Sequence, residues 1–253
     1  MKLPRLISLI FVGGVLLVLG WDMVRDELMP ADRKILFVGN SFLFVGDVPQ
    51  QVKRLAASGP EPVRYHTRMI AEPNHRLAWH VEDGKALSEL RSGVWDTVVL
   101  QDYSRTVFSP DLKAEMERSV EILTQAAEAA GTEVVFYAHW PPAPITRADR
   151  AAKVAQIERT YRHIASRTGG RVAPVGRAFA EAWDRGIAGL ISVDGHHASL
   201  LGSHVAALVV LATLGDVSPD ETNWRPEGLT EEMVAALKRD SSRYFRADFA
   251  QNR

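Results

Sequence analysis

Residues that together can activate a hydroxyl nucleophile occur at two distant places in this chain. Ser41 closes a Gly-Asn-Ser run directly after the apolar segment 35–38. Asp194 and His197 lie three residues apart, ahead of a long apolar stretch near the other end. A serine hydroxyl needs an imidazole to accept its proton and a carboxylate to orient that imidazole. The residues therefore predict acyl transfer, with Ser41 as nucleophile, His197 as base and Asp194 as the orienting acid.

Each of these places also has a simpler interpretation. Gly-Asn-Ser after a strand suits an ordinary turn. The adjacent His196 and His197 suit a surface loop, a helix cap or half of a metal site. Six more histidines could complete a metal site, but the chain has no spaced pair such as His-Glu-x-x-His. We therefore expect neither a metal nor another cofactor.

The segments around these residues predict a sheet that could position them. From Lys34 onward, short β-branched runs alternate with helical stretches, which is typical of parallel strands joined by crossover helices. Strands are expected at 35–38, 63–69, 97–100, 134–137 and 172–175. Pro174 interrupts the last run, so it is expected at an edge or a strand end. The prediction is a flavodoxin-like three-layer α/β/α sandwich with a five-stranded parallel sheet.

Helix signals separate the expected strands. Ser109 and Pro110 suit the N-cap and first position of a helix that ends at Gly131. Other helices are expected at 48–57, 150–167, 199–214 and 230–244. Ligands of such sheets bind at the carboxyl ends of the strands, where a following helix offers N–H groups to negative charge. Ser41, after the first strand, is expected at this edge.

The N-terminal sequence predicts an extracytoplasmic location for the domain. Lys2 and Arg5 precede an uncharged run from Leu6 to Trp21, which is the layout of an export signal, although a buried helix is the other interpretation. Bulky and charged residues follow this run, which favours an uncleaved anchor over a cleaved peptide. The domain would be membrane-anchored on the outer side, or periplasmic or secreted if the signal is cleaved.

Length and composition limit the organisation and the partners. We expect residues 1–30 to form a signal peptide or anchor, 31–215 the α/β domain, and 216–253 a loop and amphipathic helix packed on that domain. Thirty basic and 31 acidic residues give a net charge of -1, which provides no field for nucleic acid. The absence of cysteine excludes disulfides, thiolate catalysis and cysteine-bound metal.

The two motifs together resemble those of the SGNH hydrolases, the GDSL-like lipases and esterases. That family ends its first strand with Gly-Asp-Ser or Gly-Asn-Ser, matched here up to Ser41. Its last block is Asp-x-x-His before the final core helix, matched by Asp194 and His197. The resemblance spans about Ile35 to Leu214. It implies a serine esterase that forms an acyl-enzyme and hydrolyses O-acyl esters, with acetyl groups on carbohydrate as one expected substrate.

The chain departs from the family pattern in the two blocks that complete the oxyanion hole. The family supplies a glycine N–H and the asparagine of a Gly-x-Asn block. Here Glu-Pro-Asn-His surrounds Asn74, and Leu-Gln-Asp-Tyr-Ser runs up to Ser104. Asn74, Gln101 and Ser104 are therefore the candidate donors, although Gln101 could equally hydrogen-bond neighbouring loops. The Leu-Gln-x-x-Ser form resembles a divergent branch of the family.

Two other functions fit the same residues. A domain of this fold with decayed oxyanion blocks would be a weak or silent carbohydrate-binding or assembly domain. An O-acyltransferase would use the same triad with a sugar hydroxyl as acceptor in place of water. His139 and Trp140, after the fourth expected strand, suit either an aromatic wall of the substrate pocket or an ordinary proline-rich turn.

Overall fold

The structure is a computed structural model that describes residues 30–142, 146–251 and no others. The expected signal peptide or anchor lies outside these residues. From Arg33 onward the chain forms one compact unit. Within the described ranges, no helix is long and apolar enough to cross a membrane.

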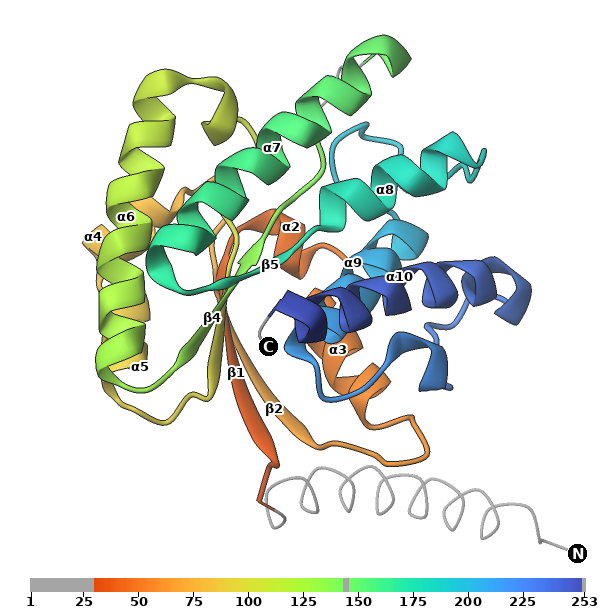
Figure 1. Ribbon diagram of the computed structural model, residues 1–253, viewed down its shortest axis with the longest axis horizontal. Helices are drawn as coiled ribbons and strands as arrows, with labels where there is room; N and C mark the ends of the chain where they lie inside the picture. Colours follow the sequence, from red (N-terminus) through yellow and green to blue (C-terminus); the bar gives the residue numbers. More distant parts are fainter. Residues whose placement is uncertain (1–29, 143–145, 252–253) are drawn as a thin grey trace, which may run out of the picture. The chain divides into compact units, whose positions relative to one another are not determined.

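Five parallel strands form a single sheet in the order β2-β1-β3-β4-β5 (Figure 1). They are β1 (Arg33–Gly39), β2 (Tyr65–Ala71), β3 (Thr97–Leu100), β4 (Glu133–Tyr137) and β5 (Arg171–Ala173). This is the flavodoxin-like strand order, so the expected five-stranded parallel sheet is confirmed. All carboxyl ends lie at one edge, where Ser41 follows β1.

Helices cover both faces of the sheet because its central strands are apolar on both sides. Ile35 and Phe37 of β1 join one core cluster, while Leu36 and Val38 join the other. The first cluster includes α3 (Val48–Ala56), α8 (Val175–Asp184), α9 (Leu200–Leu214) and α10 (Glu231–Gln251). The second includes α4 (Leu77–Asp83), α5 (Lys85–Arg91), α6 (Pro110–Ala129) and α7 (Arg147–Thr168). Figure 1 shows the two groups on opposite sides of the sheet, which confirms the three layers.

The α9 helix lies in the centre of one layer and leads away from the predicted histidine motif. Every residue from 201 to 214 is buried, as expected for a helix that is apolar all round. The Ser199 side chain accepts a hydrogen bond from the Gly202 N–H, and Gly215 ends the helix with a φ of 82°. The helix predicted over 199–214 is therefore confirmed.

The end of the fifth strand differs from the sequence prediction. The strand stops at Ala173, and Pro174 is the N-cap of α8, so Val175 is helical instead of extended. Proline lacks an N–H for the sheet but suits the start of a helix, where that N–H would have no partner. β5 is an edge strand, as predicted. The short helices α5 and α8 had not been predicted.

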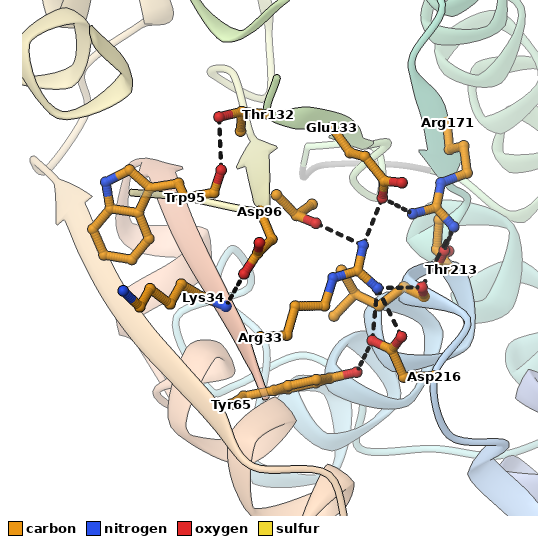
Figure 2. Close-up of polar contacts among 12 residues, drawn as sticks. Arg33, Lys34, Tyr65, Trp95, Asp96, Thr132, Glu133, Arg171, Thr213 and Asp216 are labelled. Carbon is orange, nitrogen blue, oxygen red and sulfur yellow. Dashed lines mark hydrogen bonds and ion pairs between the residues drawn. The ribbon is translucent and has the colours of Figure 1, made fainter. Parts of the chain in front are cut away.

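A polar network joins the strands at the amino edge of the sheet, opposite Ser41 (Figure 2). The Arg33 guanidinium contacts Asp216 at 2.7 Å and Glu133 at 2.5 Å, and Arg171 shares Glu133 at 2.8 Å. The Tyr65 hydroxyl donates to Asp216 at 2.5 Å. Both arginines also donate to carbonyls at the C-terminal end of α9, which have no partner inside the helix. The network therefore anchors α9 to the sheet.

Candidate active site

Ser41 is the first residue of the short helix α2 (Ser41–Phe44), at the carboxyl end of β1 (Figure 1). Asn40 precedes it in an extended conformation, and its side-chain oxygen accepts the Phe42 N–H at 3.2 Å. Ser41 is 7% exposed. The Ser41 N–H has no hydrogen-bond partner among the described residues, as expected at the start of a helix. It is therefore free to bind an incoming oxygen.

Gly39 is required by the close approach of the neighbouring strand end. A Cβ atom at this position would lie 2.6 Å from Gln101 Oε1 and 2.9 Å from both the Gln101 carbonyl oxygen and Leu43 Cδ1. The backbone carbonyl cannot rotate away as a flexible side chain could. The glycine of the Gly-Asn-Ser run thus allows Gln101 to reach the turn that carries Ser41.

Asp194 and His197 form a hydrogen-bonded pair on the loop before α9. His197 Nδ1 and Asp194 Oδ2 are 2.6 Å apart. Asp194 Oδ1 also accepts the Ser192 hydroxyl at 2.6 Å, the His196 N–H at 2.8 Å and the His197 N–H at 3.0 Å. These bonds, that of Ser192 first, hold the pKa of Asp194 well below its usual range. An ionised Asp194 only accepts, so His197 Nδ1 donates the hydrogen bond that joins the two side chains.

Aromatic contacts bring the histidine loop beside α2. Phe42, directly after Ser41, stacks on Trp140 with a centroid distance of 4.2 Å and meets the His197 ring edge-on at 6.1 Å. Trp140 Nε1 donates to the His196 carbonyl at 3.1 Å. The loop that carries Asp194 and His197 thus packs against α2, the helix that begins at Ser41, although the two segments come from opposite ends of the domain. No hydrogen bond joins Ser41 to His197 among the described residues.

His139 and Trp140 are both buried, so they do not form an exposed wall of a substrate pocket. Trp140 is 1% exposed and stacks on Phe179 on the side away from Phe42. His139 is fully buried, and this burial lowers its pKa to about 4. His139 and Trp140, after β4, therefore belong to the packed core beneath the site, where Trp140 contacts both α2 and the loop that carries His196 and His197.

Gln101 links two strand-end loops through both ends of its side chain. Its Oε1 accepts the Asn40 N–H at 2.9 Å, and its Nε2 donates to the Asp102 carbonyl. Gln101 is completely buried. Because the side chain is completely buried and is bonded at both ends to the loops, this geometry favours the loop-bonding interpretation of Gln101 over the oxyanion one.

Asn74 and Ser104 occupy different environments in the loops after β2 and β3. Asn74 is exposed, with a left-handed φ of 60°, in the turn after β2. The next carbonyl along this turn, that of His75, accepts the Asn40 side chain at 3.1 Å. Ser104 is 3% exposed, and its hydroxyl has no hydrogen-bond partner among the described residues. Both remain candidate oxyanion donors.

Two buried ionisable residues beside Ser41 were not singled out from the sequence as site residues. His80 is 1% exposed and its Nε2 donates to the Gly39 carbonyl at 2.7 Å; burial lowers its pKa, so it is neutral. Asp102, also 1% exposed, follows Gln101 and accepts backbone N–H groups. The place of Asp102 two residues after the end of β3 was the only signal that could have identified it. Within the described part of the chain, no three ionisable side chains are grouped as metal ligands would be.

The strand order and the helices on both faces place the chain in the class of flavodoxin-like α/β proteins, and comparisons with known proteins identify the superfamily. No protein-family model and no curated protein matches the chain. Among solved structures, it matches a protein from Slackia heliotrinireducens provisionally described as an SGNH hydrolase, with 28% identity over 72% of this chain and 98% of that one, and a TM-score of 0.59.

Two further solved structures share the fold at lower identity. A DUF4886 family protein from Bacteroides uniformis is 19% identical over 87% of this chain and 96% of its own, with a TM-score of 0.66. A catalytic mutant of the acetylxylan esterase Axe2 from Geobacillus stearothermophilus is 18% identical over 74% and 96%, with a TM-score of 0.56. The chain has the fold of the SGNH hydrolase superfamily, and we assign it to that superfamily. The predicted resemblance is confirmed at this level.

Proposed function

We propose that this protein is a serine esterase that hydrolyses O-acyl esters through an acyl-enzyme on Ser41. The observation that carries the proposal is the 2.6 Å pair of His197 and Asp194 on a loop packed against the residue after Ser41. Solved structures of esterases share this fold, which supports the proposal. A second histidine or a metal is not needed for this chemistry.

The reaction takes place in two transfers of the acyl group. Ser41 Oγ attacks the acyl carbon while His197 Nε2 takes the hydroxyl proton, and the same proton then goes to the departing alkoxide. Water, deprotonated by His197, attacks the acyl carbon, and the proton on His197 returns to Ser41 Oγ as the acyl-serine bond breaks and the carboxylic acid leaves. Asp194 keeps the imidazole in the productive tautomer and stabilises its charged form.

The negative charge on the acyl oxygen requires donors near Ser41. The free N–H of Ser41 is the first, and the turn at Asn74 and the hydroxyl of Ser104 are the further candidates. Each such donor contributes about 3 kcal/mol to the transition state in serine hydrolases. With Gln101 engaged elsewhere, activity depends on how well the two loops that carry these candidates are held.

We propose acetyl esters of carbohydrate as the substrate class and an extracytoplasmic location for the domain. The substrate proposal draws on the acetylxylan and acetyl-xylooligosaccharide esterases among the solved structures of this fold. The location draws on Lys2, Arg5 and the uncharged run at 6–21. Acetylated xylooligosaccharides are therefore the natural second substrate to test after a chromogenic ester.

The test is hydrolysis of p-nitrophenyl acetate by the full-length protein. Ser41→Ala and His197→Ala should each lower the rate at least about a thousandfold, because triad members act as a unit. Ser88→Ala, an exposed serine on α5, is the matched control and should retain the wild-type rate. Equal rates in wild type and Ser41→Ala would refute the proposal. Product analysis with an added sugar distinguishes hydrolysis from acyl transfer.

A further inference from the structure

Three strand-end loops around Ser41 are joined in a closed ring of hydrogen bonds. Asn40, after β1, bonds to Gln101 through its backbone and to the His75 carbonyl through its side chain. Gln101 donates to the Asp102 carbonyl, and the Asp102 carboxylate accepts the Leu77 N–H at 3.0 Å. Since His75 and Leu77 belong to one segment, the ring closes. The loops after β1, β2 and β3 therefore cannot move independently.

Asp102 is the only charged member of this ring among the described residues. One oxygen, Oδ1, accepts two backbone N–H groups, from Leu77 and from Tyr103 at 2.7 Å. These two amides belong to the segments that carry Asn74 and Ser104. The other oxygen, Oδ2, is buried and has no hydrogen-bond partner in the described chain. A single carboxylate oxygen thus ties together the two segments that hold the candidate oxyanion donors.

This charge is costly to bury, which argues against a purely structural link. Burial raises the pKa of Asp102 to about 6, although the Leu77 and Tyr103 N–H groups oppose the change. The charged and titratable groups that face it are Arg76 before α4, Glu115 on α6 and Tyr161 on α7. Arg76 is paired with Glu115 at 2.5 Å, so it does not neutralise the carboxylate by direct contact. An uncharged amide could accept the same two N–H groups at a lower cost.

We propose that Asp102 is the positioning residue of this active site, and that its ionised carboxylate holds the Asn74 and Ser104 segments in place around the acyl oxygen. The inference rests on the proposed esterase function and deepens it. Asp102 acts through the backbone and does not touch the substrate. Hydrogen bonds to an ionised acceptor are about twice as strong as those to a neutral one. A proton on Oδ2 therefore loosens both segments, and the turnover rate falls as the pH drops through about 6.

The test compares full-length Asp102→Asn with wild type. Asparagine keeps the shape and a carbonyl acceptor but cannot be charged. We expect kcat for p-nitrophenyl acetate at pH 8 to fall about tenfold or more, because small displacements of the positioned donors weaken their stabilisation of the transition state. KM should stay within about twofold of the wild-type value. The matched control is Asp96→Asn, a carboxylate that also accepts a backbone N–H, that of Lys34 at 2.7 Å, but at the amino edge (Figure 2). It should keep the wild-type kcat.

A second readout reports on Asp102 without any catalysis. In wild-type nuclear magnetic resonance spectra, the amide proton signals of Leu77 and Tyr103 should shift together with a midpoint near pH 6, and kcat should fall with the same midpoint. Amide signals that do not titrate, or an unchanged kcat in Asp102→Asn, would overturn the inference. If Ser41→Ala is as active as wild type, the esterase proposal fails instead, whatever the amides do. Should Asp102→Asn not fold, the wild-type titration still decides.

Discussion

Replacing Asp102 by asparagine should change how the stability of the fold depends on pH. Burial raises the pKa of this carboxyl from 3.8 to about 6 in the folded protein. The folded state therefore binds its proton more tightly than the unfolded chain does. The stability that this proton contributes is fully present below about pH 3.8 and is lost as the pH rises through about 6. A difference of about 2 pKa units corresponds to about 3 kcal/mol.

Urea unfolding of both proteins between pH 4 and pH 7.5 measures this quantity. Wild type should lose roughly 2 to 3 kcal/mol of stability between pH 4 and pH 7.5 through this group. Asparagine does not titrate, so the free energy of unfolding of Asp102→Asn minus that of wild type should increase by the same amount as the pH rises. Contributions of all other groups cancel in the difference. A difference that stays constant with pH, or moves in the opposite direction, would refute the account of Asp102 as a buried and unneutralised carboxylate.

Three further substitutions test other parts of the structure. Gly39→Ala places a Cβ against Gln101 and should lower esterase activity about tenfold or more in a steady-state assay. Trp140→Phe keeps the stacking but leaves the His196 carbonyl without its donor; denaturant unfolding should show a loss of about 1 kcal/mol, with a lower kcat. Arg33→Met should cost about 2 to 4 kcal/mol of stability yet leave the kcat of the folded protein unchanged, because its network lies at the opposite edge. Unchanged stability in the last two variants would contradict these assignments.

The proposed active site around Ser41 combines a conventional proton-transfer pair with an unusual support for the acyl oxygen. Asp194 and His197 are local to one loop and hold each other at 2.6 Å. In contrast, the side chain of Gln101 is used to bind the turn before Ser41. In the proposed mechanism, stabilisation of the acyl oxygen therefore depends on how rigidly the loops hold the candidate donors, and not on Gln101 as a replacement for the asparagine of the family. The proposed role of Asp102 follows from this arrangement.

The sequence by itself determined the features that depend on neighbouring residues. Apolar runs at 35–38 and 97–100 predicted the central strands because both of their faces must be covered. The apolar positions over 199–214 predicted α9 because helical periodicity depends on residues that are close in sequence. Asp194 and His197 were also recognisable, since residues three apart on one loop can meet without help from the rest of the fold.

Only the tertiary structure decided what the remaining residues at the site do. Gln101 bonds to Asn40, 61 residues away in sequence, and Asp102 bonds to Leu77, 25 residues away. No periodicity or spacing encodes such contacts, because they form only when parallel strands bring their carboxyl ends to one edge. A glutamine that donates to the acyl oxygen and one that hydrogen-bonds neighbouring loops cannot be distinguished in a sequence. Burial and hydrogen-bond partners, which exist only after folding, distinguish them.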